Sequence, residues 1–160
     1  MRRNVVLMQT AAPVHHRIFT FRTFTEWAGG RASTISADGK PTFRVASGPE
    51  FHGEPNVWTP EDLFIASIET CLLITFAAIV QKQQIPVDAY YSETVGTLEF
   101  AEGAYRFTRV VVRPTIVLAT EEATDAAMGA IHRAHRECLI ANSLLTTVIV
   151  EPEIRLRHAA

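Results

Sequence analysis

Residues 59–80 read TPEDLFIASIETCLLITFAAIV, and this stretch decides the fold. Thr59 is a residue type that caps helices, and Pro60 suits the first helical position. Asp62 stands three residues after the cap, where its side chain can return a hydrogen bond to the backbone. We therefore predict a helix that begins at Pro60 and runs to about Gln83.

The apolar side chains of this helix occur all the way round it, which predicts burial on every side. The stretch 63–80 contains no Lys or Arg and approaches the length of a membrane span, but Glu69 near its middle would be costly in lipid. A short chain has too little material to cover such a helix alone. We therefore predict no membrane association and a homodimer in which a second copy supplies the missing cover.

The rest of the chain alternates between strand and turn patterns around a second amphipathic helix. Expected strands are 18–27, 32–36, 41–47, 90–100, 105–118 and 146–156, with a second helix at 121–138 and turns at 29–30, 38–39 and 101–104. Pro114 predicts an edge position or a bulge in its strand. The order β-β-β-α-β-β-α-β indicates an α+β fold, without the strand–helix alternation of a parallel sheet.

Composition limits the domain organisation and the partners. The chain has 160 residues, a net charge of -2 and 48% hydrophobic residues, as expected for one soluble domain. We divide it into an irregular arm, residues 1–17, and a single domain, residues 18–160. Basic residues form no stripe, which disfavours nucleic acid as a partner. The apolar stretch near the start is too short for a secretory signal, so we expect a cytoplasmic protein.

Cys71 and Cys138 are the only cysteines, and each falls in a predicted helix. In a reducing cytosol they could form a transient redox couple, two inert core residues or part of a metal site. His132, His135 and Cys138 share one helix, but the first and last are 240° apart around it, which argues against a metal site. For Glu69 we favour a hydrogen bond to a facing strand over a catalytic role.

Reduction of a peroxide by thiols makes definite chemical demands. One thiolate attacks the O–O bond and becomes a sulfenic acid, and a second thiol resolves it to a disulfide. A fixed arginine would stabilise the thiolate and the departing alkoxide, and a carboxylate would hold that arginine. Arg31 and Glu61 are the best such pair by sequence, although ten residues of helix separate Glu61 from Cys71 by about 15 Å. A shared site would then need a bridging arginine or a second subunit.

The segments TPEDLFIASIETC and AHRECLIANS together resemble the OsmC/Ohr family of thiol peroxidases. The resemblance extends from about residue 24 to 156 and includes the W-x-G-G-R and SADG segments. It implies an OsmC-like intertwined homodimer, with antiparallel sheets around a long buried central helix and two sites at the interface.

The resemblance also implies roles for individual residues. Cys71 would be the peroxidatic thiol and Cys138 the resolving thiol, and Glu61 would anchor an arginine. Arg31 is the first candidate for that arginine, with Arg22 or Arg44 as alternatives. No cofactor is implied, only a hydroperoxide substrate and an external dithiol or thiol reductant.

Apolar side chains near Cys71 favour organic hydroperoxides over hydrogen peroxide. These side chains are Trp58, Phe64, Leu72 and Phe76. The alternative function is a non-catalytic ligand-binding or structural dimer that retains the fold. The reactivity of Cys71 toward peroxide distinguishes the two hypotheses.

Overall fold

The structure is a computed structural model that describes residues 17–157. The predicted arm, residues 1–17, lies outside the described residues except for Arg17. The elements are β1 (Phe24–Trp27), β2 (Ala32–Ser36), β3 (Phe43–Ala46), η1 (Pro49–Phe51), α1 (Pro60–Gln83), β4 (Val87–Ala101), β5 (Ala104–Leu118), η2 (Glu121–Ala123), α2 (Thr124–Glu137), η3 (Ala141–Ser143), β6 (Thr147–Val150) and β7 (Glu153–Leu156). These elements confirm the predicted α+β fold class and include all the predicted helices and turns.

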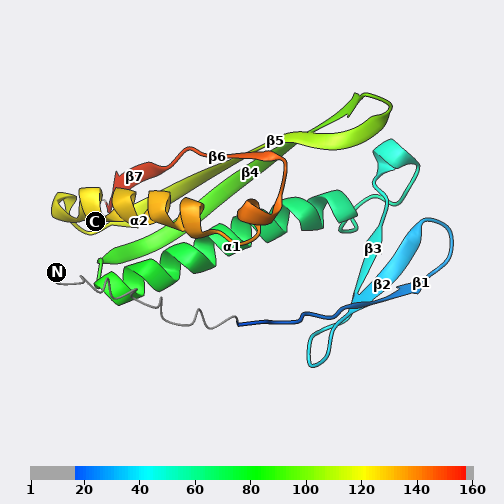
Figure 1. Cartoon of the computed structure of the whole chain (residues 1–160), viewed down its shortest axis with the longest axis horizontal. Coiled ribbons are helices and arrows are strands. Elements are labelled where there is room, and N and C mark those ends of the chain that lie inside the picture. The colour runs from blue at the N-terminus through cyan, green and yellow to red at the C-terminus, as the bar shows by residue number, and fades with distance from the viewer. Residues whose placement is uncertain (1–16, 158–160) are drawn as a thin grey trace, which may run out of the picture.

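The strands of the described chain form two sheets. The first is a three-stranded antiparallel sheet in the order β1-β2-β3, and it extends away from the remaining elements (Figure 1). The second contains the long hairpin of β4 and β5, with β6 and β7 both paired to β5 in parallel. The second sheet is therefore mixed, whereas the sequence led us to expect antiparallel sheets only.

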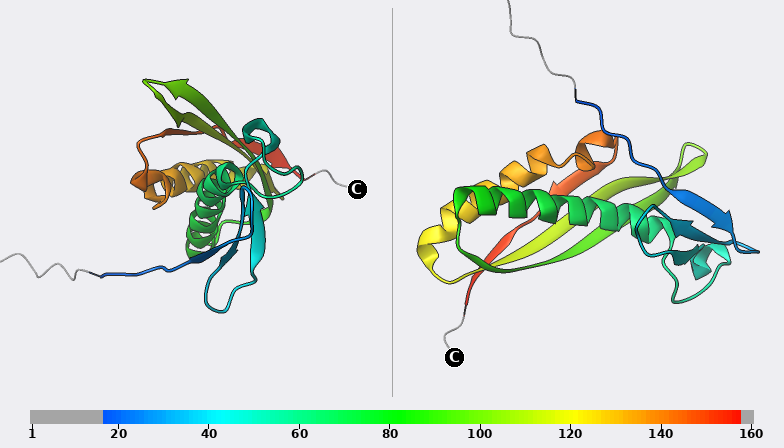
Figure 2. Two further views of the ribbon diagram at one scale, coloured as in Figure 1. Left: turned by 90° about the vertical axis from the view of Figure 1, so that its right-hand side faces the viewer. Right: turned by 90° about the horizontal axis from the view of Figure 1, so that it is seen from below.

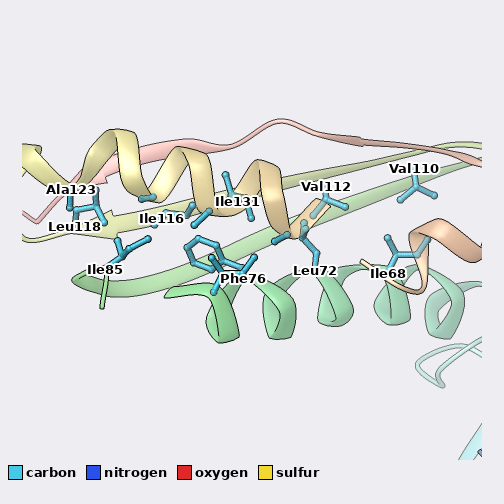
Figure 3. Close-up of a cluster of buried hydrophobic side chains, with 14 residues drawn as sticks. Ile68, Leu72, Phe76, Ile85, Val110, Val112, Ile116, Leu118, Ala123 and Ile131 are labelled. Carbon is cyan, nitrogen blue, oxygen red and sulfur yellow. The ribbon is translucent and has the colours of Figure 1, made fainter. Parts of the chain in front are cut away.

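The helices α1 and α2 lie side by side along the second sheet (Figures 1 and 2). Ile68, Leu72 and Phe76 of α1 point into the space between the helices and the sheet, in one cluster with Ile131 and Ile116 (Figure 3). These side chains are at most 2% exposed. This cluster is the hydrophobic core.

Helix α1 begins and ends where its local signals predict. The Thr59 side chain accepts a hydrogen bond from the Asp62 N–H (3.0 Å), and Asp62 Oδ2 accepts one from the Thr59 N–H (2.9 Å). Gln84 ends the helix in the left-handed conformation, two residues before Pro86. The prediction that α1 is buried on all sides is not met within one chain, because α2 and the sheet cover one face only and Ile74 is 68% exposed.

Three strand predictions need correction. The strand predicted at 18–27 begins only at Phe24, because β2 supplies partners for no residue before Phe24. The last predicted strand is broken into β6 and β7 at Pro152, which has no N–H to donate. Pro114 lies in a central strand, at neither an edge nor a bulge. Residues 109–112 of β5 pair with β6, and residues 115–118 pair with β7. Pro114 lies between these two segments, so its lack of an N–H removes no hydrogen bond from either parallel pairing.

Candidate active site between α1 and α2

Cys71 lies in the middle of α1 and is half-buried. The capping box at Thr59 fixes where the helix starts, and therefore fixes the direction in which Cys71 projects. Thr75 Oγ1 donates a hydrogen bond to the Cys71 carbonyl oxygen (2.8 Å), one turn further along. Cys71 is thus held on a regular and well-packed segment rather than on a loop.

Cys138 follows the last residue of α2 and is only 1% exposed. Its N–H donates to the His135 carbonyl oxygen (3.3 Å), and the chain then turns into η3. Helix α2 is oriented by its small apolar face, which packs into the core. The buried residues of that face are Ala127, Ala130, Ile131 and Ala134.

The two thiols meet where α1 packs against α2. Burial raises the pKa of the Cys138 thiol, and the Cys71 side chain raises this pKa further through a hydrogen bond and through its charge. The N–H groups of Ala141 and Ile140 act in the opposite direction. Both cysteines are free. Because Cys138 is buried and Cys71 is only half-buried, Cys71 is the more accessible of the two thiols to a substrate.

Glu61 lies in the first turn of α1 and is half-buried. It lines a groove of about 540 Å3 whose apolar side includes Phe51, Ile65 and Phe107. Gly96 of β4 allows α1 to approach the sheet closely there, because a Cβ at this position would lie 2.8 Å from Ile65 Cδ1. The groove therefore adjoins Glu61 and not the two cysteines.

The structure does not bring Arg31 to the cysteines of its own chain. Arg31 is exposed beside β2, and its Nη1 donates to the Phe51 carbonyl oxygen. Within residues 17–157, no ion pair joins Arg31 to Glu61 and no hydrogen bond joins it to Cys71. The predicted Arg31–Glu61 pair is thus absent from the single chain.

The two alternative arginines differ in their surroundings. Arg44 forms a bidentate ion pair with Glu54, at 3.0 Å from Nε and 2.5 Å from Nη2. This hydrogen-bonded pair lowers the pKa of Glu54. Arg22 is exposed and precedes β1. Of the three arginines, Arg44 is thus the one whose guanidinium group already pairs with a carboxylate, that of Glu54.

Glu69 accepts a hydrogen bond from the Ser92 hydroxyl of β4, which confirms the predicted bond to a facing strand. The Tyr90 hydroxyl is buried nearby and has no hydrogen-bond partner in the described part of the chain. Burial raises the pKa of Tyr90 to about 12; the neighbouring Ser92 hydroxyl acts in the opposite direction, and the charge of Glu69 adds to the increase. Glu69 therefore interacts with the sheet and not with the cysteines.

Metal-binding side chains do not converge in the described part of the chain. Among residues 17–157, no three His, Cys, Asp or Glu side chains are arranged to hold a metal ion. His135 contributes its backbone carbonyl to the turn at Cys138, and His132 is exposed.

Asn142 is a residue of the site to which the sequence analysis assigned no role. It occurs in the quoted AHRECLIANS segment, four residues after Cys138. Its N–H donates to the Cys138 carbonyl oxygen (3.0 Å), and its side chain reaches back to α2. Its place close to Cys138, in the segment that carries the family resemblance, is the signal that could have identified it.

A pair of free thiols on neighbouring helices defines this protein as a candidate dithiol protein. Residues 53–153 match the family described as OsmC-like protein, and the chain belongs to that family. The matched span includes Glu61, Cys71 and Cys138 but not Arg31.

Known proteins are similar to this chain over most of its length. The uncharacterised protein YmaD of Bacillus subtilis is 22% identical over 148 residues, which cover 89% of this chain and 95% of YmaD. A solved OsmC-like protein of unknown function from Vibrio cholerae has a TM-score of 0.77 at 25% identity, with 84% of this chain and 99% of that chain covered.

The solved structures also include proteins named for organic hydroperoxide resistance. The OsmC protein of Legionella pneumophila has a TM-score of 0.68 at 20% identity and covers 87% of this chain and 98% of its own. OhrB of Bacillus subtilis has a TM-score of 0.62 at 22% identity, with coverages of 86% and 98%. At these identities the likeness shows the fold.

Proposed function

We propose that the chain is a two-cysteine thiol peroxidase that reduces organic hydroperoxides to alcohols. The observation that carries the proposal is the contact between the half-buried Cys71 and the buried Cys138 at the α1–α2 junction. The names of several structural neighbours, which refer to organic hydroperoxide resistance, support the same substrate class.

The proposed reaction consumes one hydroperoxide for each disulfide formed. The Cys71 thiolate attacks the terminal oxygen of ROOH, the O–O bond breaks, and RO⁻ takes a proton and leaves as ROH. Cys71 is then a sulfenic acid. Cys138 attacks its sulfur, hydroxide leaves as water, and the Cys71–Cys138 disulfide forms. An external dithiol or thiol reduces this disulfide, and no cofactor takes part.

We also propose that the active protein is a homodimer. By its length and composition α1 could span a membrane, yet only 22% of its most apolar stretch is buried within the chain. Trp27 of β1 is 76% exposed. A second copy placed over these surfaces would bury them, and it could bring Arg31 or Glu61 of one subunit to Cys71 of the other.

The decisive experiment adds one equivalent of cumene hydroperoxide to the reduced protein. We expect the wild type to lose both thiols and about 2 Da, as one disulfide requires. Cys138→Ser should stop at a sulfenic or over-oxidised species, and Cys71→Ser should not react. Intact mass and free-thiol titration measure all three.

Two thiols that persist through excess peroxide would reject the peroxidase. The remaining function would then be the non-catalytic ligand-binding or structural dimer.

If the peroxidase holds, the three candidate arginines can be compared by mutation to Ala. We expect Arg31→Ala to slow oxidation of Cys71 about 100-fold. Arg22→Ala and Arg44→Ala should change that rate less than about threefold, and a larger effect of either would assign the role to it instead.

A further inference from the structure

The turn that carries Cys138 is closed by one side chain. Asn142 Nδ2 donates to the Arg136 carbonyl oxygen (2.9 Å), while the Asn142 N–H donates to the Cys138 carbonyl oxygen (3.0 Å). The Arg136 carbonyl belongs to the last turn of α2, where carbonyls have no partner within the helix. Asn142 therefore ties the chain after Cys138 to the helix before it.

No other side chain in this turn makes a comparable connection. Leu139 is 66% exposed and points away from the core. Ala141 has no polar side-chain atom, and the Ser143 hydroxyl donates within the turn itself, to the Leu139 carbonyl oxygen (2.7 Å). The backbone around Cys138 is thus connected to α2 through Asn142, while Ser143 stabilises only the exit of the turn.

The turn determines what surrounds the Cys138 sulfur. Cys138 itself has an extended backbone conformation, with φ -66° and ψ 106°. The chain then folds back so that the N–H groups of Ile140 and Ala141 face the sulfur, and the sulfur faces Cys71. Solvent lies close to this buried sulfur, since the adjoining Leu139 is exposed, and a looser turn would give the sulfur a path to it.

We infer that Asn142 is a positioning residue for Cys138, which holds its sulfur against Cys71 and away from solvent. The inference rests on the proposed function for its catalytic consequence, namely fast closure of the Cys71–Cys138 disulfide. The placement of the sulfur itself can be tested without any peroxide.

The test compares Asn142→Ala with the matched control Ser143→Ala, since both remove one hydrogen bond from a side chain to a backbone carbonyl in the same turn. Disulfide closure is followed with diamide, which oxidises two neighbouring thiols and needs no peroxidase site. A second measurement follows alkylation of Cys138 by iodoacetamide at pH 8 in a Cys71→Ser background. Thermal unfolding is recorded for every variant.

We expect Asn142→Ala to move the two rates in opposite directions. Closure with diamide should slow about tenfold, because a small misplacement of reacting groups is costly. Alkylation of Cys138 should accelerate about threefold or more, because the thiol becomes accessible. Ser143→Ala should leave both rates within about twofold of the parent. A residue that merely supports the fold would change both rates in the same direction, together with the unfolding temperature.

Two results would overturn the inference: unchanged closure in Asn142→Ala, or equal effects of the two substitutions. The peroxide reaction of the same variants separates this inference from the proposed function. If Cys71 does not react with hydroperoxide but the diamide and alkylation rates change as expected, the peroxidase fails and the positioning role stands. With an active peroxidase, Asn142→Ala should form the Cys71 sulfenic acid at the normal rate and slow only the following step.

Discussion

The two faces of α1 have similar apolar side chains in opposite surroundings. Leu72 and Phe76 are each 2% exposed beneath α2 and the second sheet, whereas Ile74, two residues from either, is 68% exposed. Nothing in the hydrophobicity of these side chains distinguishes them. An apolar helix in a sequence therefore predicts burial, but it does not say which chain provides the cover.

The largest effect is expected when one apolar side chain is removed from each face of α1 in turn. Leu72→Ala should lower the free energy of unfolding by about 2–5 kcal/mol, because it leaves a cavity in a packed core. Ile74→Ala should change it by no more than about 0.5 kcal/mol when the protein is dilute enough to be a single chain. Urea unfolding measures both. Equal losses at high dilution would mean that the outer face is covered within one chain.

A charge on the outer face would break the proposed homodimer. Ile74→Glu should weaken association by about 3 kcal/mol or more, since one unpaired charge per subunit would be buried. Light scattering during size-exclusion chromatography should then report half the wild-type mass. Gln81→Glu places the same charge in the exposed last turn of α1 and should leave the mass unchanged. A wild type that is monomeric at every concentration would reject the dimer.

Much of α1 could be predicted from sequence because its signals are local. Thr59, Pro60 and Asp62 determine its start, and Pro86 follows its end. The partners of β5 could not be predicted, because the parallel pairing to β6 depends on segments nearly 40 residues apart, from Arg109 to Thr147. The sequence pattern of a strand does not reveal which other strand it pairs with, or whether the pairing is parallel or antiparallel.

The site shows the same division between local and long-range information. The proximity of Cys71 and Cys138 was implied by the family resemblance, since spacing along the chain says nothing about it. Glu69 could be assigned a strand partner because a carboxylate in an apolar helix needs a donor. Arg31 could not be placed, because its position depends on how the first sheet sits relative to α1, and the sequence does not encode that as a local pattern.

A smaller effect concerns Tyr90 of β4, whose ring packs against Phe76 of α1. The pKa of Tyr90 is raised from 10.0 to about 12 by burial, so the folded chain favours the neutral phenol. This stabilisation is fully present below pH 10 and is lost as pH rises toward 12. Wild type should therefore lose at most about 2 kcal/mol relative to Tyr90→Phe between these pH values, because solvent screens part of the shift.

Denaturant midpoints at pH 9, 10.5 and 11.5 measure this difference, because the other tyrosines and the lysines titrate alike in both proteins. Parallel curves for wild type and Tyr90→Phe would show that the Tyr90 hydroxyl is not held in an apolar environment.

The smallest effect separates the two hydroxyl groups near Glu69 at neutral pH. Ser92→Ala removes the donor to the Glu69 carboxylate and should cost about 1–2 kcal/mol. Tyr90→Phe removes a hydroxyl that has no partner among the described residues, and should cost less than about 0.5 kcal/mol or stabilise slightly. Unfolding at pH 7 compares them, and a larger loss for Tyr90→Phe would contradict this assignment.

The position of Pro114 has a consequence for folding as well as for the finished sheet. The hairpin of β4 and β5 is local and can form early, whereas β6 and β7 must arrive from beyond α2. Until they do, one side of β5 is an unpaired strand edge that contains Val110–Val112 and Ile116–Leu118, which invites pairing with other chains. Pro114 lies at the centre of that edge and offers no N–H there, so a strand of another chain that paired with this edge would lack a hydrogen bond at its centre.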